Sequence, residues 1–150
     1  MTPTLRVFTS RLRVLGVDTS CFDSADSSAT RLTIPPQREA VGPIVVHDDD
    51  IELTIEIGTK HHTHFGGNGH VSASKSDQLH RAAIDAASFV NDLMADCVCI
   101  ATHFLDDRCI GSSHFYLDAK NLTADTVRDS LEGLMGGHIR SVRYLWSGPV

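Results

Sequence analysis

The heptapeptide IELTIEI, residues 51–57, alternates strictly between apolar and polar side chains. Successive side chains of a β-strand point to opposite faces of a sheet, so this period of two predicts a strand with one buried and one solvent-facing side. The side chains expected in the core are those of Ile51, Leu53, Ile55 and Ile57. The intervening carboxylates then face solvent. A shift of one residue would bury those carboxylates, so the alternation fixes which side of the sheet faces the core.

Six further segments are rich in β-branched or aromatic residues and are bounded by turn-forming residues. By residue number they are 31–34, 44–47, 61–65, 97–104, 109–117 and 139–146. Asp106 and Asp107 are expected to form a two-residue hairpin turn in which Leu105 pairs with Arg108. Short turns between consecutive strands favour antiparallel pairing.

Three segments have apolar residues at the spacing of an amphipathic helix. The longest covers residues 76–95 and follows a capping-box pattern that starts at Ser74. A shorter one covers residues 5–15, although alternating Arg and Val residues there also allow a strand. The last follows Thr123 and ends at Gly136. The order α-β-β-β-β-α-β-β-α-β predicts an α+β fold, with a mostly antiparallel sheet and two or three helices packed on one face.

The 150 residues of the chain fit a single domain spanning 1–150. Residues 17–30 include the small, polar run CFDSADSSAT and are expected to form a flexible loop. The chain is too short for a (β/α)₈ barrel, which needs about 250 residues. An apolar fraction of 41% is ordinary for a soluble globular protein and argues against a disordered chain.

The net charge is −6, and the acidic residues concentrate in the middle of the chain. Such a charge favours basic partners or cations, and it disfavours nucleic acid, which usually binds a basic stripe. The N-terminal sequence lacks the apolar core of a secretory signal, and no stretch reaches the roughly 18 apolar residues of a membrane span. The four cysteines lack a CxxC spacing. We therefore expect a cytoplasmic protein with reduced thiols and no membrane contact.

Four of the nine histidines lie between His61 and His70. His62 and His64 are two residues apart, so they would share one face of a strand, as the first two metal ligands of some hydrolases do. The sequence His61-His62-Thr63 also matches one H-x-T motif of phosphoesterases, but a second copy is lacking. We expect both shared-face histidines to be partly exposed without a tightly bound metal. Zinc at these residues remains the alternative.

Cysteines and histidines also come together if the Asp106-Asp107 turn is regular. Cys99 would then lie opposite His114, and the set sharing one face would be Cys97, Cys99, His103 and His114. All four are zinc-ligand types, but His103 would lie about 13 Å along the strand from Cys99, too far for one tetrahedral site. Buried free thiols are the simpler interpretation. The sequence also lacks a nucleophile elbow, a Walker loop and a Rossmann fingerprint.

Two acidic turns are candidate binding surfaces. Asp48, Asp49 and Asp50 lie at one expected hairpin tip, and Asp106 and Asp107 lie at another. Acidic residues at a tip can contact a basic partner protein. A calcium site is disfavoured, because calcium needs six or more oxygen ligands and the triplet lacks the EF-hand register.

Residues 31–96 carry the runs IPP, IVVHDDD and ELTI, glycines at 42 and 58, and HHTHF ahead of a helix. In these features the chain resembles small uncharacterised bacterial proteins that are similar in size and layout to immunity proteins of polymorphic toxin systems. The resemblance implies a single α+β domain that neutralises a toxin, and it implies no catalytic residues.

The leading hypothesis is therefore a non-enzymatic, cytoplasmic protein of immunity type without a cofactor. Its acidic turns would block a basic protein partner, for example a toxin domain, with carboxylates standing in for phosphates in the partner's active site. The alternative hypothesis is a small metal-binding protein or metal-dependent hydrolase that uses His62 and His64.

Overall fold

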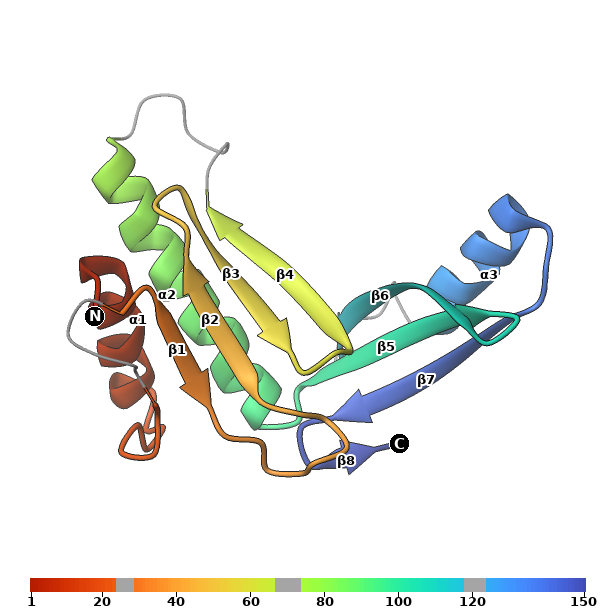
Figure 1. Ribbon diagram of the computed structural model, residues 1–150, viewed down its shortest axis with the longest axis horizontal. Coiled ribbons are helices and arrows are strands. Elements are labelled where there is room, and N and C mark those ends of the chain that lie inside the picture. The colour runs from red at the N-terminus through yellow and green to blue at the C-terminus, as the bar shows by residue number, and fades with distance from the viewer. Residues whose placement is uncertain (24–28, 67–73, 118–123) are drawn as a thin grey trace.

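The computed structural model describes residues 1–23, 29–66, 74–117 and 124–150 (Figure 1). The middle of the predicted loop 17–30 and the predicted cap Thr123 lie outside these ranges. The helices in them are α1 (Pro3–Val14), α2 (Lys75–Met94) and α3 (Ala124–Met135). The strands are β1 (Arg31–Ile34), β2 (Ile44–Asp48), β3 (Glu52–Ile57), β4 (His61–Gly66), β5 (Val98–Leu105), β6 (Arg108–Tyr116), β7 (Ile139–Leu145) and β8 (Gly148–Pro149).

The strands form two antiparallel four-stranded sheets, with the orders β1-β2-β3-β4 and β6-β5-β7-β8. The predicted α+β class and antiparallel pairing are confirmed, but the strands divide into two sheets instead of one. The division falls at α2, which carries the chain away from β4 before β5 begins. In Figure 1 the two sheets diverge from the region where β4 approaches β5 and β6.

The first sheet has the predicted register over most of β3. Leu53, Ile55 and Ile57 are fully buried, and Glu56 is exposed. The prediction for Ile51 is wrong, since this side chain is 65% exposed. The strand begins one residue later, and Ile51 belongs to the β2–β3 turn, where Asp50 adopts a φ of +64°.

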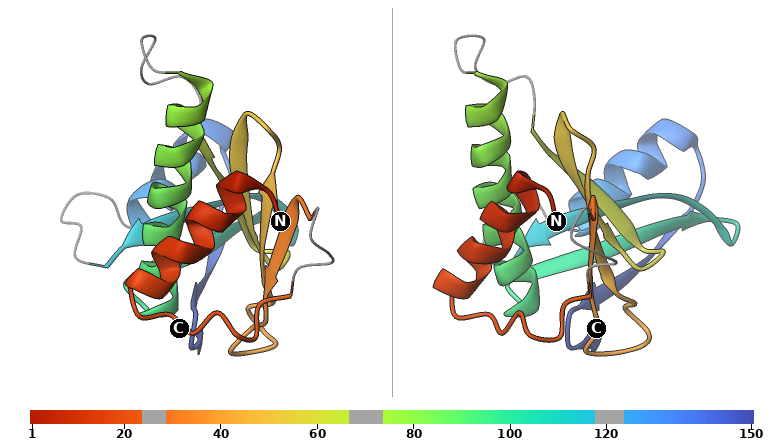
Figure 2. Two further views of the ribbon diagram at one scale, coloured as in Figure 1. Left: turned by 90° about the vertical axis from the view of Figure 1, so that its left-hand side faces the viewer. Right: turned by 60° about the vertical axis from the view of Figure 1, so that its left-hand side comes forward.

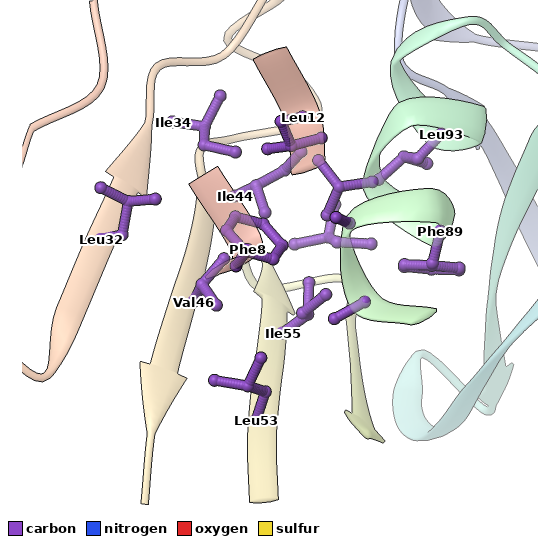
Figure 3. Close-up of a cluster of buried hydrophobic side chains, with 14 of the residues drawn as sticks. Phe8, Leu12, Leu32, Ile34, Ile44, Val46, Leu53, Ile55, Phe89 and Leu93 are labelled. Atoms are coloured by element: carbon purple, nitrogen blue, oxygen red, sulfur yellow. The ribbon is translucent and has the colours of Figure 1, made fainter. Parts of the chain in front are cut away.

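The main core lies between the first sheet and two helices, α1 and α2, which pack on the same side of it (Figures 2 and 3). Phe8 and Leu12 of α1 lie over the strands of the first sheet in this core. Phe89 of α2 belongs to the same cluster, and its ring contacts those of Phe65 and His114. Alanines line much of the buried side of α2, at positions 82, 83, 86 and 87. Small side chains let α1 approach closely. Both helices begin with a capping side chain, and Ser74 and Asp77 form the predicted capping pair.

The second sheet shares this core at one end and carries α3 near the other (Figure 1). Val98, Ile100 and Trp146 join the main cluster. On the opposite face, a small second cluster joins Ala101 and Phe115 with Val127 of α3. No helix in the described ranges is long and apolar enough to cross a bilayer.

Two glycines permit a close backbone contact that holds the loop after β1 against the β3–β4 turn. Gly42 has a φ of +86° and Gly58 a φ of +51°. A Cβ atom at position 42 would lie 2.7 Å from the Gly58 Cα. One at position 58 would collide with the Val41 carbonyl oxygen. Both positions therefore require glycine on two grounds, the left-handed backbone and the lack of space.

Replacing Gly58 with Ala should lower the free energy of unfolding by more than about 1 kcal/mol, because the new methyl group strains the backbone and collides with Val41. Gly133 is the matched control, since it lies in α3 with open space around it. Gly133→Ala should stabilise the protein by up to about 1 kcal/mol. Urea denaturation of the three proteins measures both changes. Equal stability of wild type and Gly58→Ala would contradict the close contact.

Candidate functional site

One side of the first sheet carries neither α1 nor α2, because both helices pack on its other side (Figure 2). The strand register places polar side chains from all four strands together on this helix-free side. They are Arg31 and Thr33 of β1, His47 of β2, Glu52, Thr54 and Glu56 of β3, and His62 and His64 of β4. We call this set the outer face.

The outer face holds two separate groups of short polar contacts. His47 Nε2 lies 3.1 Å from Glu56 Oε2, and His64 Nδ1 lies 3.0 Å from Glu52 Oε1. Thr54 lies between the two glutamates on β3, and its Oγ1 is 3.1 Å from His64 Nδ1. Exposed pairs of this kind contribute less than about 1 kcal/mol each to stability. Their main effect is to orient the two glutamates.

His62 and His64 are both exposed and share the outer face, as predicted. Their ring centroids are 5.4 Å apart in an edge-on arrangement. His64 directs its Nδ1 toward Glu52. Within residues 1–23, 29–66, 74–117 and 124–150, no group of three or more His, Cys, Asp or Glu side chains is placed to hold a metal ion.

The first acidic turn divides its three carboxylates between two sides of the hairpin. Asp48 is only 6% exposed, and its Oδ1 accepts a hydrogen bond from the Asp50 N–H. Asp49 accepts a hydrogen bond from the Thr54 hydroxyl at 3.1 Å, so its carboxylate adjoins the outer face. Asp50 is exposed at the tip. The triplet is therefore not one exposed patch.

The second acidic turn lies at the opposite end of the molecule, at the tip of the β5–β6 hairpin (Figure 1). Asp106 and Asp107 have φ angles of +48° and +64°, which is the geometry of a type I′ turn, and Leu105 pairs with Arg108 as predicted. Asp107 accepts a hydrogen bond from Arg140 at 3.3 Å. The two acidic turns do not form one continuous surface.

His61 points away from the outer face and joins the two sheets. Its Nδ1 lies 2.8 Å from the Ser112 hydroxyl of β6, and its Nε2 lies 2.9 Å from His114 Nδ1. The His114 ring packs edge-on against Phe89 of α2. Burial, with smaller contributions from His114 and His62, lowers the pKa of His61 to about 4. Burial also lowers the pKa of His114.

A similar network lies on the other face of the second sheet. His103 is 1% exposed, and its two ring nitrogens each lie 2.8 Å from a serine hydroxyl, one from Ser113 and one from Ser141. Burial lowers its pKa. The three serines could not be predicted from the sequence, because their only local signal is a polar residue at an inward position of a strand.

The predicted shared face of Cys97, Cys99, His103 and His114 is wrong. Cys99 pairs with Phe115, and His114 pairs with Ile100 on the opposite face. The cause is an irregularity beside His103, where Gly111 and then Cys109 are paired and Ile110 is skipped. One extra residue in a strand moves every later side chain to the other face.

The Ser112–His61–His114 chain has the order of a nucleophile, a base and an orienting group. An imidazole with a pKa of about 4 is a weak general base at neutral pH, however. His103, which is 1% exposed, likewise places its ring nitrogens against serine hydroxyls, those of Ser113 and Ser141. Together these observations favour a structural role, in which neutral imidazoles satisfy buried hydroxyl groups.

No family model matches the chain, and neither a curated protein nor a solved structure matches it.

The histidine network predicts that acid destabilises the fold. Between pH 6.5, the ordinary pKa of the side chain, and about 4, His61 binds fewer protons in the folded protein than in the unfolded chain. The free energy of unfolding should therefore fall as the pH drops through this window, and His103 and His114 should add to the fall. Urea denaturation at several pH values measures the slope.

His61→Gln should reduce this slope, because glutamine keeps polar groups at the site and does not titrate. His138 is the matched control, since its side chain is 92% exposed and pairs only at the surface with Glu132. His138→Gln should leave the slope close to that of wild type. An NMR titration of the His61 ring with a midpoint near 6.5 would contradict the buried, neutral imidazole.

Proposed function

We propose that this chain is a non-enzymatic protein that binds a basic partner protein through the outer face and the adjoining Asp49. The observation that carries the proposal is the gathering of three carboxylates, Asp49, Glu52 and Glu56, on the side of the first sheet that α1 and α2 leave open. An immunity-type role in the cytoplasm, with a toxin domain as the partner, is the biological setting that we propose for this binding.

The outer face fixes its carboxylates more firmly than a flexible loop would. Glu52 and Glu56 lie on one strand, four residues apart and on the same side, which corresponds to about 13 Å along the strand. Each has a histidine within 3.1 Å. Oriented acidic groups can meet a matching set of cationic groups with little loss of side-chain freedom.

The charge of the chain supports the same partner chemistry. A net charge of −6 attracts a basic protein over long distances and raises the association rate, an effect that salt weakens. Asp106 and Asp107 contribute to this general field, but they lie at the other end of the molecule and outside the proposed interface (Figure 1).

The proposal predicts that removing two outer-face charges slows association. Glu52→Gln/Glu56→Gln should lower the association rate with the basic partner by about tenfold or more at low salt, and should flatten its salt dependence. Asp106→Asn/Asp107→Asn removes the same charge from the distant hairpin and should have a smaller effect. Both pairs are surface changes that should alter stability by no more than about 0.5 kcal/mol.

The measurement uses each basic protein encoded beside the gene for this chain, with association followed by stopped-flow fluorescence at low and high salt. Failure of every such protein to bind, or equal rates for the two double variants, would contradict the proposal. Metal content should be measured on the same untagged preparation. About one zinc per chain, lost in His62→Ala/His64→Ala, would favour the metal-dependent alternative.

A further inference from the structure

A cavity of about 380 Å³ lies where the beginnings of α1 and α2 approach the β2–β3 turn. Figure 2 shows these three parts at one end of the molecule, on the helix side of the first sheet. The volume falls within the range of about 300 to 1,000 Å³ that is typical of small-molecule sites. The cavity is separate from the outer face, which lies on the other side of the sheet.

Asp48 supplies a buried carboxylate to this cavity. The residue is 6% exposed, and its Oδ1 accepts the Asp50 N–H at 3.2 Å. In the described part of the chain, no cationic side chain forms an ion pair with it and no second donor reaches it. The Asp48 carboxylate is not among the buried unpaired groups of the described residues, so its second oxygen stays accessible from the cavity and can pair with a ligand ammonium group. Asp50 lines the same cavity and adds a second carboxylate.

Thr4 gives a second, independent indication of a ligand. It lines the cavity and is 8% exposed, yet among the described residues its hydroxyl has no hydrogen-bond partner. Thr4 Oγ1 is not among the buried unpaired polar atoms of the described residues, so it stays accessible from the cavity and can bond a ligand there. A polar group of a bound molecule would provide the missing partner.

The start of α2 contributes a positive charge to the same cavity. Lys75 and Ser76 line the cavity in the first turn of this helix, where Ser74 already accepts the Asp77 N–H and the two preceding N–H groups have no acceptor within the helix. Lys75 forms no ion pair with Asp48 or Asp50 in the described ranges. The cavity therefore offers both signs of charge, unpaired with each other.

The rest of the lining combines apolar side chains, chiefly Val7 of α1 and Leu79 of α2, with His80 of α2 and with Thr2 and Pro3 at the start of α1. We propose that the cavity binds a free α-amino acid with an aliphatic side chain. The ammonium group lies at Asp48 and Asp50, the carboxylate lies at Lys75 and the start of α2, and the aliphatic group contacts Val7 and Leu79. This site is independent of the proposed partner surface.

The test is isothermal titration calorimetry with L-leucine, L-valine, L-isoleucine and L-methionine. At least one of them should bind with a dissociation constant below about 10 mM, which is weak binding. N-acetyl-L-leucine lacks the ammonium group and L-leucine methyl ester lacks the carboxylate, so each should bind at least tenfold more weakly than leucine. Equal binding of either derivative, or no binding of any of the four amino acids, would overturn the proposal.

Variants separate this cavity from other sites. Asp48→Asn keeps an oxygen for the Asp50 N–H but loses the charge. Lys75→Ala removes the ammonium group from the first turn of α2. Each should weaken binding at least tenfold. Asp49→Asn is the matched control, because Asp49 lies in the same turn but contacts Thr54 on the outer face, and it should bind as wild type does. Unchanged binding by both Asp50→Asn and Lys75→Ala would overturn the assignment even where Asp48→Asn fails to fold.

Discussion

Burial of Leu53, Ile55 and Ile57 against α1 and α2 is the constraint on which both candidate surfaces depend. Full burial of one such side chain contributes about 1.5–3 kcal/mol. Three of them therefore contribute about 4.5–9 kcal/mol of gross burial energy toward offsetting the conformational entropy that folding costs. A one-residue shift of β3 would forfeit this burial and place Glu52 and Glu56 in the core. The same three side chains thus hold the helices on one side and keep the carboxylates on the other.

The second sheet is joined to this core in a different way. Apolar contact comes from Val98, Ile100 and Trp146, with Tyr144 packed against the same cluster, and polar contacts add to the junction. At the junction, His61 reaches from β4 to Ser112 and His114 of β6. Hydrogen bonds between neutral partners add about 1 kcal/mol each, but a lost partner leaves a buried polar group unsatisfied. The relative placement of the two sheets is therefore sensitive to the charge state of a few imidazoles.

The sequence predicted the helices and strands well, because their signals are local: a capping box at Ser74, alternation along β3 and a two-residue turn at Asp106-Asp107. It failed where the outcome depends on distant segments. The sequence near Ile110 does not indicate the extra residue that moves His114 to the other face. The contact between His61 and Ser112 spans 51 residues, and neither residue has a neighbour in the sequence that indicates it. The division into two sheets is likewise a matter of packing around α2.

The acidic triplet shows how a single turn can serve two surfaces. Alternation along β2 directs Asp48 inward, and the hydrogen bond from the Asp50 N–H fixes its carboxylate. Asp49 is held on the other side by Thr54 and by its own N–H, which donates to the Glu52 carbonyl at 3.1 Å. Sequence alone treats the three aspartates as equivalent charges at a tip. The backbone geometry instead assigns one to the cavity wall and one to the outer face, so a substitution at either position tests a different hypothesis although the two residues are adjacent.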